Sequence, residues 1–405
     1  MNTFPVSVIP FLSDMLPVLR EYSSMPPADF AMKIKSDTIP IPVADAARLL
    51  DCYQRASQKF PTLHREGMLY TRKAIEQSTG EAVMTFKKRL FKGDTAIDLT
   101  GGLGMDSIFL ADAFENVIYV EKDGIVCKTA SHNHKLLGYD NIRHYESDAE
   151  EWLKQKKNTV IDLIYIDPSR RDSNKRFFRL RDCEPDVRLL YPLLDTRTRL
   201  LVVKVSPLYD IQQLTREIPA IRDIYVISVN GEVKEVLSVS EPQETDADEE
   251  PTVHAVALDK QGNETEKVSV KLNESPPADT AIEPMGFLYE PDATIIKAGL
   301  TRKYAVKLGI NKLNQGSDYL TSDKLIPDFC GKKFLITAVI PFKPRIIKQF
   351  LKEQQIEKVM IHKRDFPQTV DVLYKKFGLS MGNQAHLFFT KHGDGGLIML
   401  VAEGV

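Results

Sequence analysis

The part of the sequence that most limits the fold begins at residue 95, where short β-rich runs are each followed by a helical stretch. The seven runs are TAIDLT, NVIYVEKD, IRHYESD, VIDLIYIDP, RLLVVKVSP, IYVISV and VHAVALD. Strands that alternate with helices form βαβ units, in which the strands run parallel. The sequence therefore predicts an α/β protein with a doubly wound, mainly parallel sheet of seven strands.

The residues on either side of this alternation have other patterns. Residues 11–35 and 43–92 carry apolar side chains at helical spacing, so a helical region is expected before the sheet. The Pro-rich sequence NESPPAD, at 273–279, is expected to end the α/β unit. The predicted regions are a helical N-terminal region at 1–80, a main α/β domain at 81–272, a small connecting α/β segment at 280–325 and a closing α+β domain at 326–405.

Composition and length exclude several classes of protein. At 405 residues the chain is too long for one ordinary core, because single cores usually stop growing near about 250 residues. No window approaches the roughly 18 uninterrupted apolar residues that a membrane-spanning helix needs. The N-terminal sequence lacks a basic start and is interrupted by Pro5, Pro10 and Asp14, so it does not match a signal peptide. We expect a cytoplasmic protein.

No metal site is expected from the cysteines and histidines. The four cysteines are scattered, without a CxxC pair or a nearby His at ligand spacing, which argues against zinc and against a disulfide framework. His132 and His134 are two residues apart on a predicted helix, and side chains at that spacing do not share a face.

Charge is unevenly spread along the chain. The net charge is −2, but residues 241–250 hold six carboxylates and no basic residue, as expected of a solvated loop. Residues 280–405 contain 18 Lys and Arg against 12 Asp and Glu. The overall charge therefore does not exclude a nucleic-acid partner, because the C-terminal third is basic.

A glycine-rich turn, AIDLTGGLGMD at 96–106, joins the first predicted strand to a helix. Such a turn lets the backbone approach a nucleotide-like ligand closely, although any tight strand-to-helix turn can use glycine. A dinucleotide pyrophosphate at this helix N-terminus would be repelled by Asp98 and Asp106, whereas a ligand with an ammonium and a sulfonium would be attracted. Ser107 also replaces the third glycine of the GxGxxG pattern.

Acidic residues end the next three predicted strands as well. Glu121 ends the second strand, where a carboxylate can accept hydrogen bonds from ribose hydroxyls, or it is a surface acid. Asp148 follows the third strand, where it can accept from an adenine amino group or cap the helix AEEWLKQ. Asp167 follows the fourth. The carboxyl ends of parallel strands are where ligands bind in open α/β sheets, so the four acids together indicate a binding site.

These motifs in combination resemble class I S-adenosylmethionine-dependent methyltransferases, over roughly residues 75–240. KVSP at 204–207, GEVKE at 231–235, LYEPDATIIKAGL and YLTSD extend the resemblance to a subgroup of RNA methyltransferases with a C-terminal THUMP-like domain. The resemblance implies a Rossmann-like fold, S-adenosylmethionine as cofactor, a ferredoxin-like segment at 280–325 and a THUMP-like domain at 326–405.

The resemblance also assigns roles to residues. The glycine loop and Asp98 would hold the methionine part of the cofactor, Glu121 the ribose and Asp148 the adenine, and Gln77 is also expected to face the cofactor. The predicted cofactor-binding residues are Gln77, Asp98, Thr100, Gly101, Gly102, Gly104, Asp106, Glu121 and Asp148.

The sequence Asp167-Pro168 is the predicted catalytic position, with Asp167 expected to orient or deprotonate the target. Methylases of exocyclic amines that resemble this chain carry D-P-P-Y, whose aromatic ring stacks on the base. Here Ser169 and Arg170 replace the last two residues, which argues against an exocyclic amine as the target. A stacking ring would then have to come from a nearby aromatic residue.

A basic segment directly follows this position. Arginine pairs bidentately with phosphate and stacks on bases, so the segment predicts contact with RNA, unless it is a solvated loop whose arginines pair with neighbouring acids. The predicted RNA-binding residues are Arg170, Arg171, Lys175, Arg176, Phe177, Phe178 and Arg179.

The sequence thus predicts an enzyme that transfers a methyl group from S-adenosylmethionine to a base of transfer or ribosomal RNA. Two alternatives stay open. One is a methyltransferase of a protein or small molecule, and the other is a non-catalytic RNA-binding module with a vestigial cofactor fold.

Overall fold

The computed structural model describes residues 5–155, 161–170, 179–243, 250–274, 277–281 and 283–405. The chain forms two compact units. The first comprises residues 1–225, 234–251 and 258–264, and the second comprises residues 226–233, 252–257 and 265–405.

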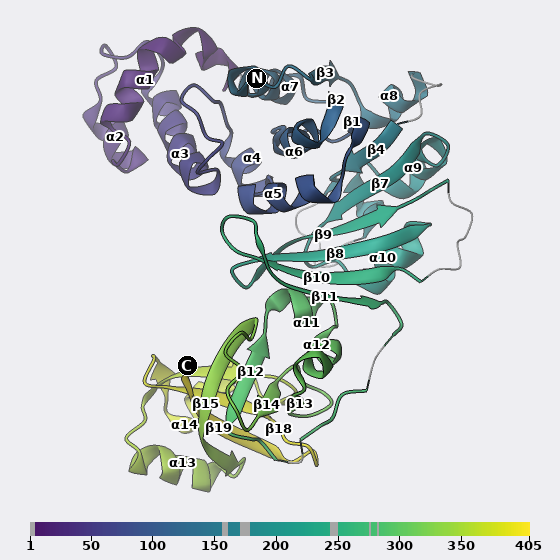
Figure 1. Cartoon of the computed structure of the whole chain (residues 1–405). Helices are drawn as coiled ribbons and strands as arrows, with labels where there is room; N and C mark the ends of the chain where they lie inside the picture. The colour runs from purple at the N-terminus through teal and green to yellow at the C-terminus, as the bar shows by residue number, and fades with distance from the viewer. Residues whose placement is uncertain (1–4, 156–160, 171–178, 244–249, 275–276, 282) are drawn as a thin grey trace. The chain divides into compact units, whose positions relative to one another are not determined.

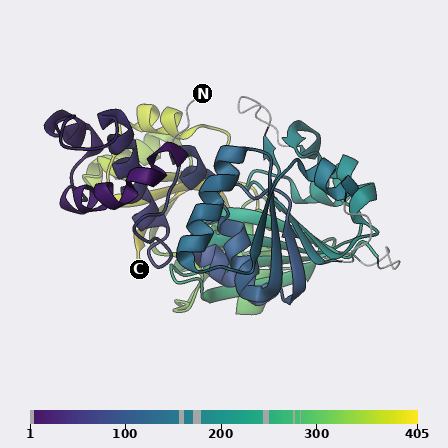
Figure 2. The ribbon, with the colours of Figure 1, turned by 90° about the horizontal axis from the view of Figure 1, so that it is seen from above.

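Short helices form the N-terminal part of the first unit, drawn in purple and dark blue in Figures 1 and 2. Their apolar faces enclose a core in which Met15, Phe30 and Leu49 are fully buried. Pro27 begins the second α-helix, at a position where no backbone N–H is needed. The elements are η1 (Val6–Phe11), α1 (Leu12–Glu21), α2 (Pro27–Lys33), α3 (Val43–Lys59), α4 (Arg72–Gln77) and α5 (Glu81–Leu90).

A nine-stranded sheet follows, in the order β11-β10-β8-β9-β7-β4-β1-β2-β3 (Figure 1). Its strands are β1 (Gly93–Asp98), β2 (Phe114–Glu121), β3 (Ile142–Glu146), β4 (Ile161–Ile166), β7 (Thr198–Val205), β8 (Ile221–Val229), β9 (Glu232–Ser240), β10 (Thr252–Leu258) and β11 (Glu264–Lys271). The first five run parallel, and β9 runs antiparallel to β7. The α/β fold that the sequence predicts is therefore confirmed.

Two strands extend the sheet beyond the seven expected ones. Both β9 and β11 begin with exposed charged residues, and their buried positions follow only later in the strand. A β-rich run is hard to recognise in such a sequence, because the apolar pattern covers only part of the strand.

Helices connect the parallel strands, and their ends are fixed by local sequence. Asp123 caps α7 by accepting from the backbone N–H groups of Ile125 and Val126. Gly138 ends the same helix in the left-handed region, at φ 82°. The helices are α6 (Met105–Ala113), α7 (Gly124–Leu137), α8 (Ala149–Gln155), α9 (Val187–Leu194) and α10 (Ile211–Glu217), with the 3-10 helix η2 (Leu180–Asp182).

The second unit contains an eight-stranded sheet in the order β13-β14-β12-β15-β19-β18-β16-β17. Ile347 and Leu351 of α13 and Leu373 of α14 pack against apolar side chains of this sheet. Its strands are β12 (Phe287–Pro291), β13 (Asn311–Lys312), β14 (Leu320–Ser322), β15 (Gly331–Pro341), β16 (Lys358–Lys363), β17 (Ser380–Met381), β18 (Ala385–Lys391) and β19 (Leu397–Gly404). Its helices are α11 (Ala293–Lys297), α12 (Thr301–Leu308), α13 (Pro344–Glu353) and α14 (Val370–Phe377).

Within the described residues, no helix is long and apolar enough to cross a membrane. The same residues contain no group of three His, Cys, Asp or Glu side chains placed to hold a metal ion. The acidic stretch and the NESPPAD sequence lie partly outside the described residues.

Candidate active site

A cavity of about 370 Å³ lies where strands β1 to β4 end. Its volume is in the range of small-molecule sites, roughly 300–1,000 Å³, and its place is the ligand-binding edge of open parallel sheets. The predicted site residues that line it are Gln77, Thr100, Gly101, Gly102, Asp106, Glu121, Asp148 and Asp167. Asp98, Gly104 and Pro168 are not part of the lining.

The loop from β1 to α6 requires glycine for two different reasons. A Cβ atom on Gly101 would come within 2.2 Å of the Tyr119 ring, so no side chain fits there. Gly104 has φ 83°, and a Cβ atom would lie 2.4 Å from Nε2 of His134. That ring nitrogen is hydrogen-bonded to the Gly104 carbonyl at 2.9 Å. The loop is therefore pressed against β2 and α7 and presents its backbone to the cavity.

Asp98 stabilises this loop by hydrogen bonds to residues on either side of its glycines. Its side chain is buried, and it accepts from the backbone N–H of Thr100 at 3.1 Å and from the Ser107 hydroxyl at 2.7 Å. Burial raises the pKa of Asp98 to about 7. The structure thus gives Asp98 and Ser107 a shared role in shaping the loop, whereas the sequence suggested direct contact between Asp98 and the cofactor.

Glu121 closes one side of the cavity. Its Oε2 atom accepts from the backbone N–H of Gly102 at 2.9 Å, and its Oε1 atom accepts from that of Asp123 at 2.8 Å. Two backbone donors hold the carboxylate in one orientation at the end of β2. Each carboxylate oxygen has a second lone pair, so the fixed group can accept further hydrogen bonds from a ligand.

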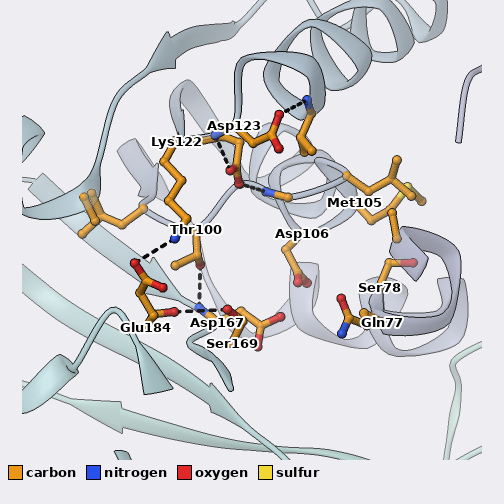
Figure 3. Close-up of a pocket in the computed structure, with 18 of the residues that line it drawn as sticks. Gln77, Ser78, Thr100, Met105, Asp106, Lys122, Asp123, Asp167, Ser169 and Glu184 are labelled. Carbon is orange, nitrogen blue, oxygen red and sulfur yellow. Dashed lines mark hydrogen bonds and ion pairs between the residues drawn. The ribbon is translucent and has the colours of Figure 1, made fainter. Parts of the chain in front are cut away.

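Asp148 has both of the roles that the sequence left open. Its Oδ1 atom accepts from the backbone N–H of Glu150 at 2.8 Å, which caps helix α8, and the residue also lines the cavity. On another side of the cavity, Gln77 is exposed at the end of α4. In Figure 3 the Asp106 side chain lies between Asp167 on one side and Gln77 on the other.

Asp106 belongs to a cluster of buried charges below the cavity. Its carboxylate lies 2.5 Å from Nζ of Lys87 and 3.2 Å from Nζ of Lys204. Burial alone would raise the pKa of Asp106, but the two ammonium groups lower it below its ordinary value. Thr79 donates toward Asp106, and Glu235 lies 3.1 Å from Lys87. The negative charge of Asp106 is thus shared with two lysines before any ligand arrives.

Asp167 follows β4 and reaches the cavity with its side chain about one third exposed. Its backbone N–H donates to the Thr100 hydroxyl at 2.7 Å, and its Oδ2 atom lies 2.6 Å from Nζ of Lys204. Burial raises the pKa of Asp167, and Lys204 opposes that rise. Asp167 therefore sits beside the glycine loop, as expected, but with an ionic partner that the sequence did not reveal.

The chain after Asp167 forms a two-stranded ribbon at the edge of the cavity. Strand β5 (Ser169–Arg170) pairs antiparallel with β6 (Cys183–Glu184), and Ser169 and Glu184 line the cavity. Glu184 is paired with Lys122 at 2.8 Å (Figure 3). Of the predicted RNA-binding residues, the side chain of Arg170 and residues 171–178 lie outside the described part of the chain, and Arg179 is exposed.

Four residues of the buried cluster were not predicted from the sequence, namely Thr79, Lys87, Lys204 and Glu235. Lys87 belongs to the sequence KKRL, and such a run of basic residues is typical of a solvent-exposed helix end, so it did not predict a buried lysine. Lys204 left a clearer signal, because a charge in the middle of the apolar strand LLVVKV has to find a partner once it is buried.

Comparison with known proteins finds two matching domain models and relatives that cover most of the chain. A model described as a ferredoxin-like domain matches residues 287–329, and one described as THUMP domain-like matches residues 331–404. An uncharacterized S-adenosylmethionine-dependent methyltransferase of Mycobacterium tuberculosis, strain H37Rv, is 27% identical over 336 residues, which cover 82% of this chain and 87% of the relative. A crystal structure from Porphyromonas gingivalis W83, assigned as a methyltransferase, is 26% identical and covers 97% of this chain and 98% of its own, with a TM-score of 0.81.

The chain is an S-adenosylmethionine-dependent methyltransferase with a THUMP-like domain, and it is similar to these relatives over most of its length. The predicted family, enzyme class and cofactor are thereby confirmed for this methyltransferase. A shorter match concerns the ribosomal RNA small subunit methyltransferase J of Bdellovibrio bacteriovorus, which is 33% identical over 76 residues, 18% of this chain and 30% of that relative.

Proposed function

We propose that this methyltransferase methylates a base of RNA, in transfer or ribosomal RNA. The proposal rests on the position of the β5–β6 ribbon, which contributes residues to the edge of the cofactor cavity. Ser169 and Glu184 are paired at one end of the β5–β6 ribbon and line the cavity, and the arginine-rich segment 171–182 joins the other end of the ribbon, where Arg170 pairs with Cys183. A sequence whose arginines can bind phosphate and stack on bases is thus connected to the cavity edge through a ribbon of two residues on each strand.

The cavity fits S-adenosylmethionine in shape and charge. The absence of side chains at Gly101 and Gly102 brings the backbone to the cavity surface, where the methionine part would lie. Among the described lining residues, six carboxylates face two lysines, and a cleft dominated by one sign of charge favours a ligand of the opposite sign. We assign the ribose to Glu121 and the adenine to Asp148.

When bound, S-adenosylmethionine supplies a methyl group to the electron pair of the attacking RNA atom, as the electron pair of the carbon–sulfur bond returns to sulfur. The chain's own contribution is to orient the reactants and to take up a proton. Asp167 is the group for the second task, because its carboxylate lies beside the glycine loop and next to the ribbon. Its raised pKa makes it a better proton acceptor than an exposed aspartate.

RNA as the substrate class has two supports besides the ribbon. The C-terminal third of the chain is basic, and one relative with a matching segment is named as a ribosomal RNA methyltransferase. Within that C-terminal region, Lys332 and Arg364 are paired with Glu290, so other basic residues, such as Lys343, Arg345 and Lys348 on and before α13, are the better candidates for phosphate contact.

Nucleoside mass spectrometry of total RNA tests the proposal. RNA from cells with and without the protein should differ by one methylated nucleoside, which returns when the gene is restored. Identical nucleoside profiles, together with loss of a methylated protein or small molecule, would favour the other class of substrate. RNA binding with no methylated product of any kind would favour a non-catalytic binding module.

A further inference from the structure

Lys204 is a buried lysine whose ammonium group contacts polar side chains from three other segments of the chain. It lies in β7, a strand with buried residues on both faces, and its side chain is 9% exposed. Its Nζ atom lies 2.6 Å from Oδ2 of Asp167, 3.2 Å from Oδ2 of Asp106 and 3.1 Å from the Thr79 hydroxyl. One ammonium therefore joins the cofactor-side helix α6 to the proposed catalytic carboxylate.

Only one of the two carboxylate oxygens of Asp167 has a partner among the described residues. Lys204 occupies Oδ2, the backbone N–H is bound to Thr100, and among the described residues no hydrogen bond to Oδ1 is present. Since Asp167 lines the cavity, Oδ1 is the oxygen available to a substrate there.

We propose that Lys204 is a positioning residue that fixes Asp167 by one oxygen, so that the other oxygen receives the proton of the attacking RNA atom. The inference rests on the proposed function, and it adds a residue that does not line the cavity. In the transfer step, the proton leaves the nucleophile for Oδ1 of Asp167, while Lys204 keeps its own proton and its charge.

The charges around Asp167 explain why a cation is needed there. Three acidic side chains from separate elements interact electrostatically with it, namely Asp98 of β1, Asp106 of α6 and Glu235 of β9, and so does the phenol of Tyr165 on β4. Lys87 of α5 pairs with Asp106 and Glu235, and no contact between Lys87 and Asp167 is present among the described residues. Without Lys204, burial and the carboxylates of Asp106 and Glu235 would all raise the pKa of Asp167.

The matched pair Lys204→Gln and Lys87→Met tests the proposal. Both remove one buried cation from the same cluster, but only Lys204 contacts Asp167. The measurement is the single-turnover rate of RNA methylation against pH, which rises with pH as the base loses its proton. K204Q should move that rise to higher pH by about 1 to 3 units, the range expected for loss of a close opposite charge. K87M should leave its position unchanged, and K204R should restore it.

A second readout does not depend on RNA. In the protein without substrate, carbon-13 NMR of labelled aspartate carboxyl groups reports the titration of Asp167, whose signal is identified by its loss in D167N. Its midpoint should rise in K204Q and stay in K87M. If K204Q does not fold, Lys204→Met replaces it, because methionine keeps an unbranched side chain in the strand and carries no charge.

The outcomes separate the two proposals. An unchanged rate profile and an unchanged NMR midpoint in K204Q would overturn the role of Lys204. Equal shifts in K204Q and K87M would show that only the total charge of the cluster matters. A parent enzyme that methylates no RNA would instead overturn the proposed function, and the NMR titration would still decide the role of Lys204.

Discussion

Replacing Glu121 with Ala should weaken cofactor binding without unfolding the sheet. The carboxylate is fixed by the backbone N–H groups of Gly102 and Asp123, and in the proposed complex it also accepts from the ribose hydroxyls. Hydrogen bonds to a charged group contribute about 1.5–3 kcal/mol each. Losing the equivalent of one such bond predicts a rise in Kd of about 10-fold to 150-fold.

The assay is titration calorimetry with the demethylated cofactor product, which binds but cannot react. Glu146→Ala is the matched control, because Glu146 stands next to Glu121 in register on β3 but does not line the cavity. It should change Kd by less than about twofold, which is within about 0.4 kcal/mol. A loss of less than threefold in E121A, or an equal loss in both variants, would refute the assignment of Glu121 to the ribose.

Three further predictions concern the chemical step, RNA binding and pH. Asp167→Asn should slow single-turnover methylation by about 100-fold to 10,000-fold at saturating cofactor and RNA, whereas a loss under about fivefold would mean that Asp167 only shapes the loop. Burial raises the pKa of Asp98 from about 4 in the unfolded chain to about 7 in the folded protein. The protonated carboxyl therefore stabilises the folded state fully below about pH 4, and this contribution is lost as pH rises through 7. The unfolding free energy of the cofactor-free parent, measured in urea relative to Asp98→Asn, should therefore fall by about 4 kcal/mol over that range, and a flat difference would contradict this. The slope of log RNA affinity against log salt should flatten by roughly 3 when four arginines are neutralised together, and an unchanged slope would exclude them from phosphate contact. The four are Arg170, Arg171, Arg176 and Arg179.

The ends of the strands could be predicted because they are marked by residues that are adjacent in the sequence. A run of apolar residues followed by an acid or a glycine predicts both the strand and the edge at which its last side chain lies. That rule was enough to bring Glu121, Asp148, Asp167 and the glycine loop to one cavity. It could not show that Asp98 points under the loop, because that depends on the hydroxyl of Ser107 in the next helix.

The buried cluster was not predictable in the same way. Thr79, Lys87, Lys204 and Glu235 come from four segments spread over more than 150 positions, and only the folded chain brings them together. A single charged residue in an apolar strand indicates that a partner exists, but it does not identify the partner. The strand pattern of β9 was weak for a related reason, since its buried part includes Glu235.

Transfer of a labelled methyl group is the most direct test of whether this protein methylates RNA. Purified protein is mixed with S-adenosylmethionine carrying a tritiated methyl group and with RNA extracted from cells that lack the protein, and the RNA is then digested to nucleosides. We predict that the label enters RNA, appears in one nucleoside, and is strongly reduced with D167N. Label that is recovered only in protein or in small molecules, or that stays entirely in the cofactor although the cofactor binds, would contradict this prediction.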